Sequence, residues 1–206
     1  MKVYDVEKFP NPIRVRMALA EKGATDQVTF VPVDLMKGEH RSAAFTAKNP
    51  SAAVPVLELD DGTYISECSA ITEYIDHAYD GPSLTGKTPR ERAFIAMMQR
   101  RAEAMVLDAV GAYFHHATPG LGPELEVNQN QAWGLKQRDV ALSGMAYFNK
   151  VLEGQTFVVG DVFSIADITL FAGLVFSDFA KIDVPDELSN LKGWRERVAA
   201  RPSASM

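Results

Sequence analysis

The stretch Val54-Pro-Val-Leu-Glu-Leu-Asp-Asp-Gly-Thr-Tyr-Ile-Ser-Glu-Cys-Ser-Ala-Ile71 decides the fold of the first part of the chain. It predicts a strand, a tight turn, a second strand and the start of a helix. The Asp-Gly pair at 61–62 favours a hairpin, because glycine adopts the positive φ angles of such turns at low cost. The helix that begins near residue 67 presents free N–H groups, which can bind an anion. The stretch therefore predicts a cradle for a peptide-like anion.

Elements of the same kind precede this stretch, and the expected order over residues 1–79 is βαβαββα. In the first helix, Asn11 suits the N-cap, Pro12 suits the first helical position and Gly23 suits the C-terminal position. Pro32 indicates a strand at a sheet edge. The expected elements are strands at 1–6 and 28–35, helices at 12–22 and 42–49, the hairpin, and a helix at 67–79.

Residues 80–89 (DGPSLTGKTP) combine two glycines and two prolines with small polar residues, which is typical of a linker. The rest of the chain shows helical periodicity. Ser164 and Asp167 have the spacing of a capping-box variant. We therefore expect an α+β domain at 1–79, a linker at 80–89 and an all-α domain at 90–206. The expected helices are 90–117, 124–152, 164–179 and one that begins at Pro185 and stops before Pro202.

Composition excludes several classes of protein. The chain has 206 residues, 47% of them hydrophobic, and a formal net charge of −6. Such a charge argues against nucleic-acid binding, which needs clustered positive charge. No apolar run approaches the ~18 residues of a membrane span, and the first residues resemble a strand rather than a signal peptide. A single cysteine, Cys68, excludes an internal disulfide and fits a cytoplasmic protein. No residues have metal-ligand spacing.

The βαβαββα domain, the proline before the third strand and the linker into a helical domain resemble a cytosolic glutathione transferase. The resemblance covers essentially the whole chain. A thioredoxin-type oxidoreductase would share the first domain, but it would need a cysteine near residues 9–13, and this chain has none. Four segments carry the resemblance: Ala53–Leu57, Glu67–Ile75, Gly38–His40 and Phe163–Thr169.

This resemblance implies a thioredoxin-like first domain, glutathione as co-substrate, no metal and a homodimer. It implies a cis peptide bond at Pro55 and antiparallel pairing of the Val54 backbone with the cysteinyl part of glutathione, which is strand addition. The N–H of Cys68 would bind the γ-glutamyl carboxylate, and Glu67 would bind the ammonium group. His40 would contact the glycyl carboxylate.

The chain departs from the family pattern at two places. Cys68 occupies the position of the usual serine, and it is either a small substitute for serine or a reactive thiol at a helix N-terminus. The turn at residues 8–13 (KFPNPI) has no hydroxyl or thiol to bind the glutathione sulfur. Tyr4 lies too early in the first strand to take that role.

The thiolate therefore needs another source of stabilisation. A free thiol has a pKa of ~8.5, and lowering this by two units requires ~2.7 kcal/mol. A helix N-terminus supplies ~0.3–1 kcal/mol, or ~2 when partly buried, and one neutral hydrogen bond adds ~1. The candidates for the missing donor or base are Asn11, His115 and His116. Asn11 could instead only cap its helix, and the histidines could instead face solvent near the helix C-terminus.

The function expected from the resemblance is conjugation of the glutathione thiolate to small hydrophobic electrophiles, as in detoxification. Two alternatives stay open: a glutathione-binding carrier with little turnover, and a glutathione-dependent isomerase or dehalogenase. Arg100, Arg101 and Glu103 could contact a second subunit or form a solvated face.

Overall fold

The computed structural model describes residues 1–205, which form two compact units: Met1–Ser83 and Leu84–Ser205. Met206, the last residue of the expected helical domain, lies outside the described residues. Within the described part of the chain, no helix is long and apolar enough to cross a membrane.

The first unit contains a four-stranded mixed sheet in the order β2-β1-β3-β4. Strand β1 pairs parallel with β2 and antiparallel with β3, and β3 pairs antiparallel with β4. Pro32 ends the edge strand β2, where its missing N–H removes no hydrogen bond from the sheet. Gly62 adopts a φ of 84° in the turn between β3 and β4, as the hairpin signal predicted. The strands are β1 (Lys2–Asp5), β2 (Thr29–Pro32), β3 (Val56–Glu58) and β4 (Tyr64–Ile65).

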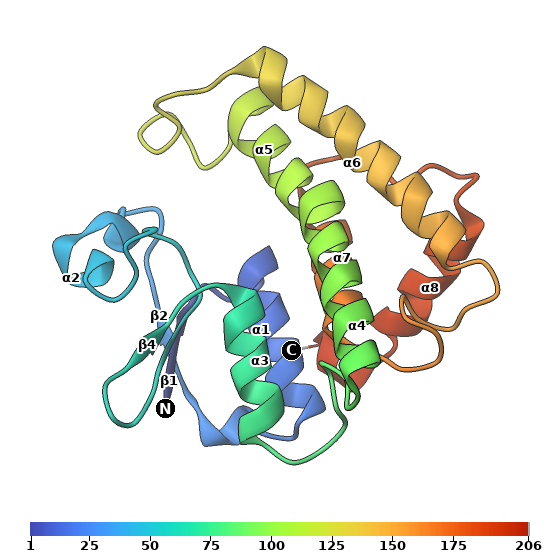
Figure 1. Ribbon diagram of the computed structural model, residues 1–206. Coiled ribbons are helices and arrows are strands. Elements are labelled where there is room, and N and C mark those ends of the chain that lie inside the picture. The colour runs from blue at the N-terminus through green and yellow to red at the C-terminus, as the bar shows by residue number, and fades with distance from the viewer. Residues whose placement is uncertain (206) are drawn as a thin grey trace. The chain divides into compact units, whose positions relative to one another are not determined.

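Helices α1 and α3 lie side by side in this unit (Figure 1). A buried ion pair joins them, in which Lys22 Nζ lies 3.0 Å from Asp76 Oδ1 and also donates to the backbone carbonyls of Asp76 and Pro82. The order βαβαββα and the thioredoxin-like fold of this unit are confirmed. The helices are α1 (Pro10–Glu21), α2 (Ala43–Thr46) and α3 (Cys68–Ala78), with 3₁₀ turns at Thr25–Gln27 and Glu39–Arg41.

The expected start of the first helix is wrong by two residues. Phe9 is the N-cap and the helix begins at Pro10, so Asn11 lies inside the first turn and does not cap it. Pro10 is the proline at the helix start, where its missing N–H would have no intrahelical partner. The side chain of Asn11 is thereby available for other contacts.

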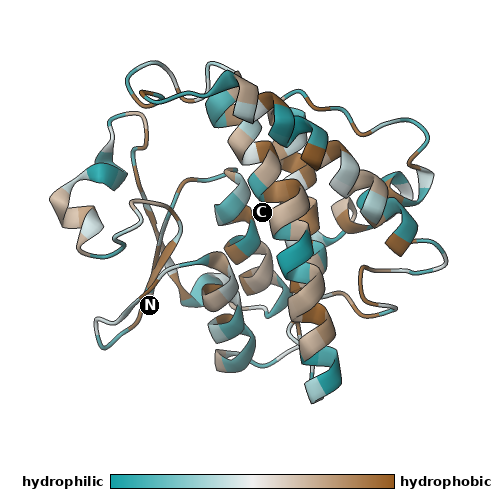
Figure 2. Ribbon diagram, turned by 45° about the horizontal axis from the view of Figure 1, so that its top comes forward, coloured by the Kyte–Doolittle hydropathy of each residue, from teal (hydrophilic) through white to brown (hydrophobic). Residues whose placement is uncertain are grey.

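The second unit is helical throughout, and a π-turn joins α4 to α5 without a break in the coil (Figure 1). Hydrophobic and hydrophilic residues alternate along its helices (Figure 2). This pattern is typical of helices that have one buried side. The elements are α4 (Pro89–Ala102), the π-turn (Glu103–Leu107), α5 (Asp108–Ala117), α6 (Gln131–Val151), α7 (Ile165–Phe179), α8 (Ser189–Ala199) and a 3₁₀ turn (Pro202–Ser205).

Two expected helix starts in this unit are wrong. Helix α6 begins at Gln131 rather than near residue 124, because the Asn130 side chain accepts a hydrogen bond from the Trp133 N–H and caps the helix there. Residues 118–130 form a loop instead. Helix α8 begins at Ser189 and not at Pro185.

The capping box of α7 holds the core of the second unit together. The buried Asp167 carboxylate accepts hydrogen bonds from the N–H groups of Ser164 and Val158 and from the Trp194 indole. The Ser164 hydroxyl also lies 3.1 Å from Asp167 Oδ2. Burial raises the pKa of Asp167 to about 6, although these donors act in the opposite direction. The predicted capping box is confirmed.

Candidate functional site

The segment before β3 presents an open backbone edge. The Val54–Pro55 peptide bond is cis. Asn49 is buried and holds the preceding turn, because its Nδ2 donates to the Ala53 carbonyl at 2.7 Å and its Oδ1 accepts from the Ser51 N–H at 3.1 Å. Within residues 1–205, the N–H and carbonyl of Val54 make no backbone hydrogen bond. This edge can therefore pair with an extended peptide.

The N-terminus of α3 follows the hairpin directly. Glu67 adopts a φ of 68°, a left-handed conformation that turns the chain into the helix at Cys68. The first intrahelical bond runs from the Ile71 N–H to the Glu67 carbonyl. The N–H groups of residues 68–70 therefore have no intrahelical acceptor, and they suit a carboxylate ligand.

The first turn of α1 meets the first turn of α3 at Asn11 and Cys68. Cys68 is 6% exposed, and its thiol lies 3.4 Å from the Asn11 carbonyl and 3.7 Å from Asn11 Oδ1. Arg14, also buried, donates from Nη1 to the same Oδ1 at 3.1 Å. Because the guanidinium is only a donor, the amide oxygen faces it and the Nδ2 amino group faces away. The exposed Asn11 thus presents an N–H donor beside two helix N-termini.

His40 lies in the 3₁₀ turn that follows β2. Its side chain is buried, and its Nδ1 has no hydrogen-bond partner among residues 1–205. Burial lowers the pKa of His40, and the nearby charge of Arg41 lowers it further. A neutral imidazole with an unsatisfied nitrogen is a suitable group for a polar ligand.

Tyr4 does not supply the hydroxyl that the first turn lacks. Its OH lies 2.5 Å from the Glu58 carboxylate, a contact made across the pair of strands β1 and β3. That hydrogen bond and burial raise the pKa of Tyr4. The hydroxyl is therefore engaged within the sheet, in agreement with the expectation that Tyr4 lies too early.

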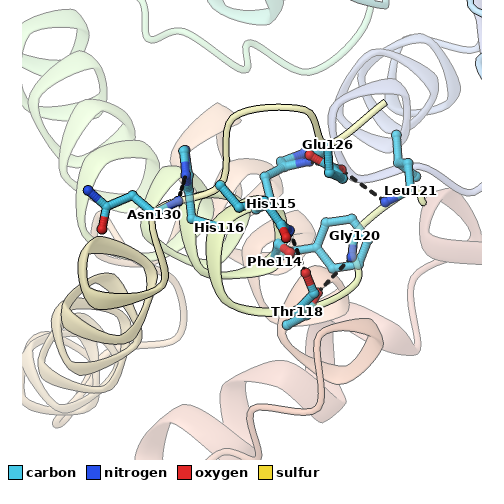
Figure 3. Close-up of polar contacts among 9 residues, drawn as sticks. Phe114, His115, His116, Thr118, Gly120, Leu121, Glu126 and Asn130 are labelled. Atoms are coloured by element: carbon cyan, nitrogen blue, oxygen red, sulfur yellow. Dashed lines mark hydrogen bonds and ion pairs between the residues drawn. The ribbon is translucent and has the colours of Figure 1, made fainter. Parts of the chain in front are cut away.

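The two adjacent histidines lie at the end of α5 in the second unit, and both contact the loop 118–130 (Figure 3). His115 Nδ1 lies 2.7 Å from Glu126 Oε1. His116 Nδ1 accepts a hydrogen bond from the Asn130 N–H at 3.1 Å. Gln129 donates from Nε2 to the carbonyls of His115 and Thr118. Each imidazole therefore has one nitrogen engaged by the loop, which the helical pattern did not predict.

An aromatic group adjoins His115. The ring of Phe114 packs edge-on against His115 with centroids 5.0 Å apart, and it also contacts Phe176 and Phe179. Phe179 is 65% exposed. This group offers apolar surface next to a titratable side chain.

Of the residues expected at the site, the first unit brings Asn11 and Cys68 into contact and places Val54, Pro55 and Glu67 around the hairpin. His115 and His116 belong to the second unit. The residues described here include no cluster of three or more His, Cys, Asp or Glu that could hold a metal ion. The sequence did not predict the contacts of Asn49, Arg14 and Glu126. Only Asn49 carried a local signal, as the expected end of the helix at 42–49.

Two known domain families match the chain. The family described as "Glutathione S-transferase, N-terminal domain" matches residues 10–78, and the family described as "Glutathione S-transferase, C-terminal domain" matches residues 104–202. Together they cover most of the sequence.

Individual proteins match the chain over nearly its whole length. Glutathione S-transferase 2 of Saccharomyces cerevisiae is 58% identical over 204 residues, which cover 98% of this chain and 87% of the relative. Maleylacetoacetate isomerase of Pseudomonas aeruginosa is 30% identical over 212 residues, which cover 98% of this chain and 93% of the relative. The crystal structure of a glutathione S-transferase domain-containing protein from Marinobacter aquaeolei VT8 has a TM-score of 0.97 at 66% identity, and covers 98% of this chain and 99% of that one.

Proposed function

The chain belongs to the cytosolic glutathione S-transferase family and is a transferase, and from this membership we propose that it conjugates the glutathione thiolate to small hydrophobic electrophiles. The observation that carries the proposal is the meeting of Asn11 and Cys68, where a side-chain N–H donor lies beside the N-termini of α1 and α3. A position beside two helix N-termini favours a bound anion.

The first unit has the groups that a γ-glutamyl tripeptide requires. The free backbone edge of Val54 pairs with the cysteinyl residue, as in strand addition. The N–H groups at Cys68 and beyond bind the γ-glutamyl carboxylate, and the exposed carboxylate of Glu67 binds the ammonium group. The unsatisfied nitrogen of His40 supports a contact with the glycyl end.

Activation of the thiol begins with the first turn of α1. Asn11 donates from Nδ2 to the sulfur, and Arg14 holds the amide in the orientation that makes this possible. A hydrogen bond to a charged acceptor contributes ~1.5–3 kcal/mol, against ~1 for a neutral one. Together with the helix N-terminus, this approaches the ~2.7 kcal/mol that a two-unit shift in the thiol pKa requires.

His115 or His116 accepts the thiol proton, since an imidazole titrates near the working pH. The aromatic group of Phe114, Phe176 and Phe179 next to His115 supports a hydrophobic second substrate. We propose a role in detoxification, a cytoplasmic location and glutathione as co-substrate without a metal.

We also propose a homodimer. Helix α4 carries Phe94 and Met97 one turn apart, and both are exposed in the single chain, which suits burial against a second subunit. Arg100 and Arg101 already have partners within the chain, Glu103 and Tyr147, so they do not depend on a second subunit for their contacts.

One alternative has support from a specific observation. The relative named maleylacetoacetate isomerase is 30% identical over almost the whole chain. A glutathione-dependent isomerase would use the same thiolate but would release it unchanged. The other alternative, a carrier that binds glutathione without turnover, would not lower the thiol pKa.

The test measures turnover of glutathione with a panel of electrophiles and with a cis-configured unsaturated diketo acid, beside calorimetric binding of glutathione. The proposal expects conjugates from the electrophiles. Isomerisation without conjugation would favour the isomerase, and tight binding without either reaction would favour the carrier.

A further inference from the structure

We infer that the second unit carries a binding pocket for a polar organic carboxylate, and that Arg197 is the residue that binds the carboxylate group. The pocket has a volume of about 490 Å³ and is open to solvent. One wall is the segment that follows α6, with Gln155 and Thr156, and the other is one side of α8, with Asn190, Gly193 and Arg197. Every residue of this pocket belongs to the second unit, so the inference goes beyond the proposed conjugation and is independent of it.

Hydrogen bonds hold the two walls in place. Asn149, near the end of α6, accepts with Oδ1 from the Leu191 N–H at 3.1 Å and with its carbonyl from Asn190 Nδ2 at 3.2 Å. Further along α8, Arg197 Nη2 donates to the Thr156 carbonyl at 3.3 Å. The walls are therefore joined at two places along α8, and the pocket is formed before a ligand enters it.

The charge of Arg197 has no counter-ion in this unit, in contrast to two other basic residues of α8. Lys192 pairs with Asp186, and Arg195 pairs with Asp178. Within residues 1–205, Arg197 makes no ion pair, and its hydrogen bond goes to a backbone carbonyl. Among the described residues that line the pocket, Arg197 is the one charged side chain. A guanidinium has five N–H donors, so most of them stay available to a ligand.

Gly193 leaves space beside this guanidinium. Apart from the backbone of its own helix, a Cβ at Gly193 would have a single neighbour within 4 Å, which is Arg197 Nη1 at 3.7 Å. Glycine is less favourable than alanine inside a helix. Here neither a left-handed φ nor close packing against another element requires it. The effect of the glycine is to keep the pocket open next to Arg197.

The other polar groups favour a ligand that has several hydrogen-bond acceptors. Gln155 Oε1 accepts from the Gly160 N–H at 3.0 Å, so the Nε2 amino group of Gln155 stays available as a donor. A planar carboxylate matches the guanidinium of Arg197, because two parallel hydrogen bonds can form between them. One positive charge balances one negative charge, whereas a phosphate dianion would leave a negative charge without a partner on a chain of net charge −6. These features select a monocarboxylate with carbonyl groups in its body.

N-acetylglycylglycine represents this class, since it has one carboxylate and two amide carbonyls, and its C-terminal amide is the uncharged control. The measurement is the shift of the backbone amide NMR signals of Gly154, Gln155 and Gly193 at neutral pH and constant ionic strength. Arg197→Gln removes the guanidinium, and Gly193→Leu fills the pocket. Arg195→Gln is the matched control, because it removes the same charge from α8 at a residue outside the pocket lining.

We expect the acid to bind with a Kd of about 1–10 mM, and its amide to bind about tenfold more weakly. Arg197→Gln should weaken binding of the acid about tenfold, and Arg195→Gln should leave the Kd within about twofold. Gly193→Leu should abolish the shifts.

Four results would overturn the inference. The first is the absence of shifts around this pocket at about 20 mM acid, including the case in which shifts are confined to the first unit. The second is equal binding of the acid and its amide, and the third is unchanged binding in Arg197→Gln. The fourth is tighter binding of inorganic phosphate than of the acid, which would contradict the assignment to a carboxylate.

Discussion

Replacing Asn11 by alanine should raise the pKa of the bound glutathione thiol by about one unit. Arg14 and Cys68 both approach Asn11 Oδ1, which leaves the Nδ2 amino group as the donor for the sulfur. A hydrogen bond to a charged group contributes ~1.5–3 kcal/mol, and the exposure of Asn11 places it at the lower end. The loss of about 1.5 kcal/mol corresponds to about one pKa unit.

The measurement is the ultraviolet absorbance of the bound thiolate as a function of pH, together with kcat/KM over the same range. Below the thiol pKa, kcat/KM should fall about tenfold, and it should approach the wild-type value at alkaline pH. The free energy of unfolding should fall by about 1–3 kcal/mol, because the buried Arg14 guanidinium loses the Asn11 Oδ1 acceptor, although Phe9 is the N-cap of α1 and alanine favours a helix.

Asn11→Asp is the matched control. It keeps the size of the side chain and an oxygen toward Arg14, but it replaces the amino group with a negatively charged oxygen. The thiol pKa should therefore rise more than in Asn11→Ala. Identical titration curves for the wild type and both variants would refute the reasoning that Asn11 stabilises the thiolate.

Three further predictions follow from buried polar groups. If the buried thiol only substitutes for serine, Cys68→Ser should keep glutathione affinity and turnover within about threefold; fast modification of native Cys68 by a thiol reagent would contradict this. Lys22→Met should lower the free energy of unfolding by about 3–5 kcal/mol in urea titrations, because it leaves the buried Asp76 carboxylate without its lysine, and Lys22→Met with Asp76→Leu should recover part of the loss. Because the pKa of Asp167 is raised above its unfolded value of 3.8 to about 6, its contribution to stability is present below pH 4 and is lost as the pH rises through 6. Urea titrations should show the wild type gaining up to about 3 kcal/mol relative to Asp167→Asn between pH 7 and pH 4, and a change of the opposite sign would contradict the raised pKa.

The fold of the first unit was predictable because its signals are local. The Asp-Gly turn at 61–62, the edge residue Pro32 and Gly23 each act within a few residues of the element that they shape. The Ser164–Asp167 capping box is equally local. The structure adds that its carboxylate also receives the indole of Trp194, a contact between α7 and α8 that no local pattern encodes.

The errors in the predicted helix starts have a common physical cause: neighbouring residues that each favour a helix start compete with one another. Asn11 resembled an N-cap, but Pro10 already starts the helix one residue earlier. Helical periodicity extended α6 back to residue 124, but the cap at Asn130 sets its true start. Gly144 lies within α6. In the structure a Cβ at Gly144 would lie 2.3 Å from the Met105 carbonyl, so the glycine permits close packing of two helices.

The candidate site was predictable where it is made of backbone and not where it is made of side-chain pairs. Val54, Pro55 and Cys68 follow from one continuous stretch. The contact of Arg14 with Asn11 depends on the burial of an arginine, and the contact of Glu126 with His115 depends on the path of a 13-residue loop. Neither burial nor loop path can be derived from residue spacing alone.

The most direct test of the central claim is the number of protons released when glutathione binds. Calorimetry at pH 7 in buffers of different ionisation enthalpy gives this number, with S-methylglutathione as the control that has no thiol proton. A free thiol of pKa ~8.5 is almost fully protonated at this pH. If binding lowers the pKa by two units, about 0.7 proton leaves the thiol, and it is released with glutathione, and not with the control, unless a histidine retains it. The ultraviolet absorbance of the bound thiolate, measured in the same samples, detects ionisation in either case. Tight binding of glutathione with neither proton release nor thiolate absorbance would contradict thiol activation and would favour a carrier.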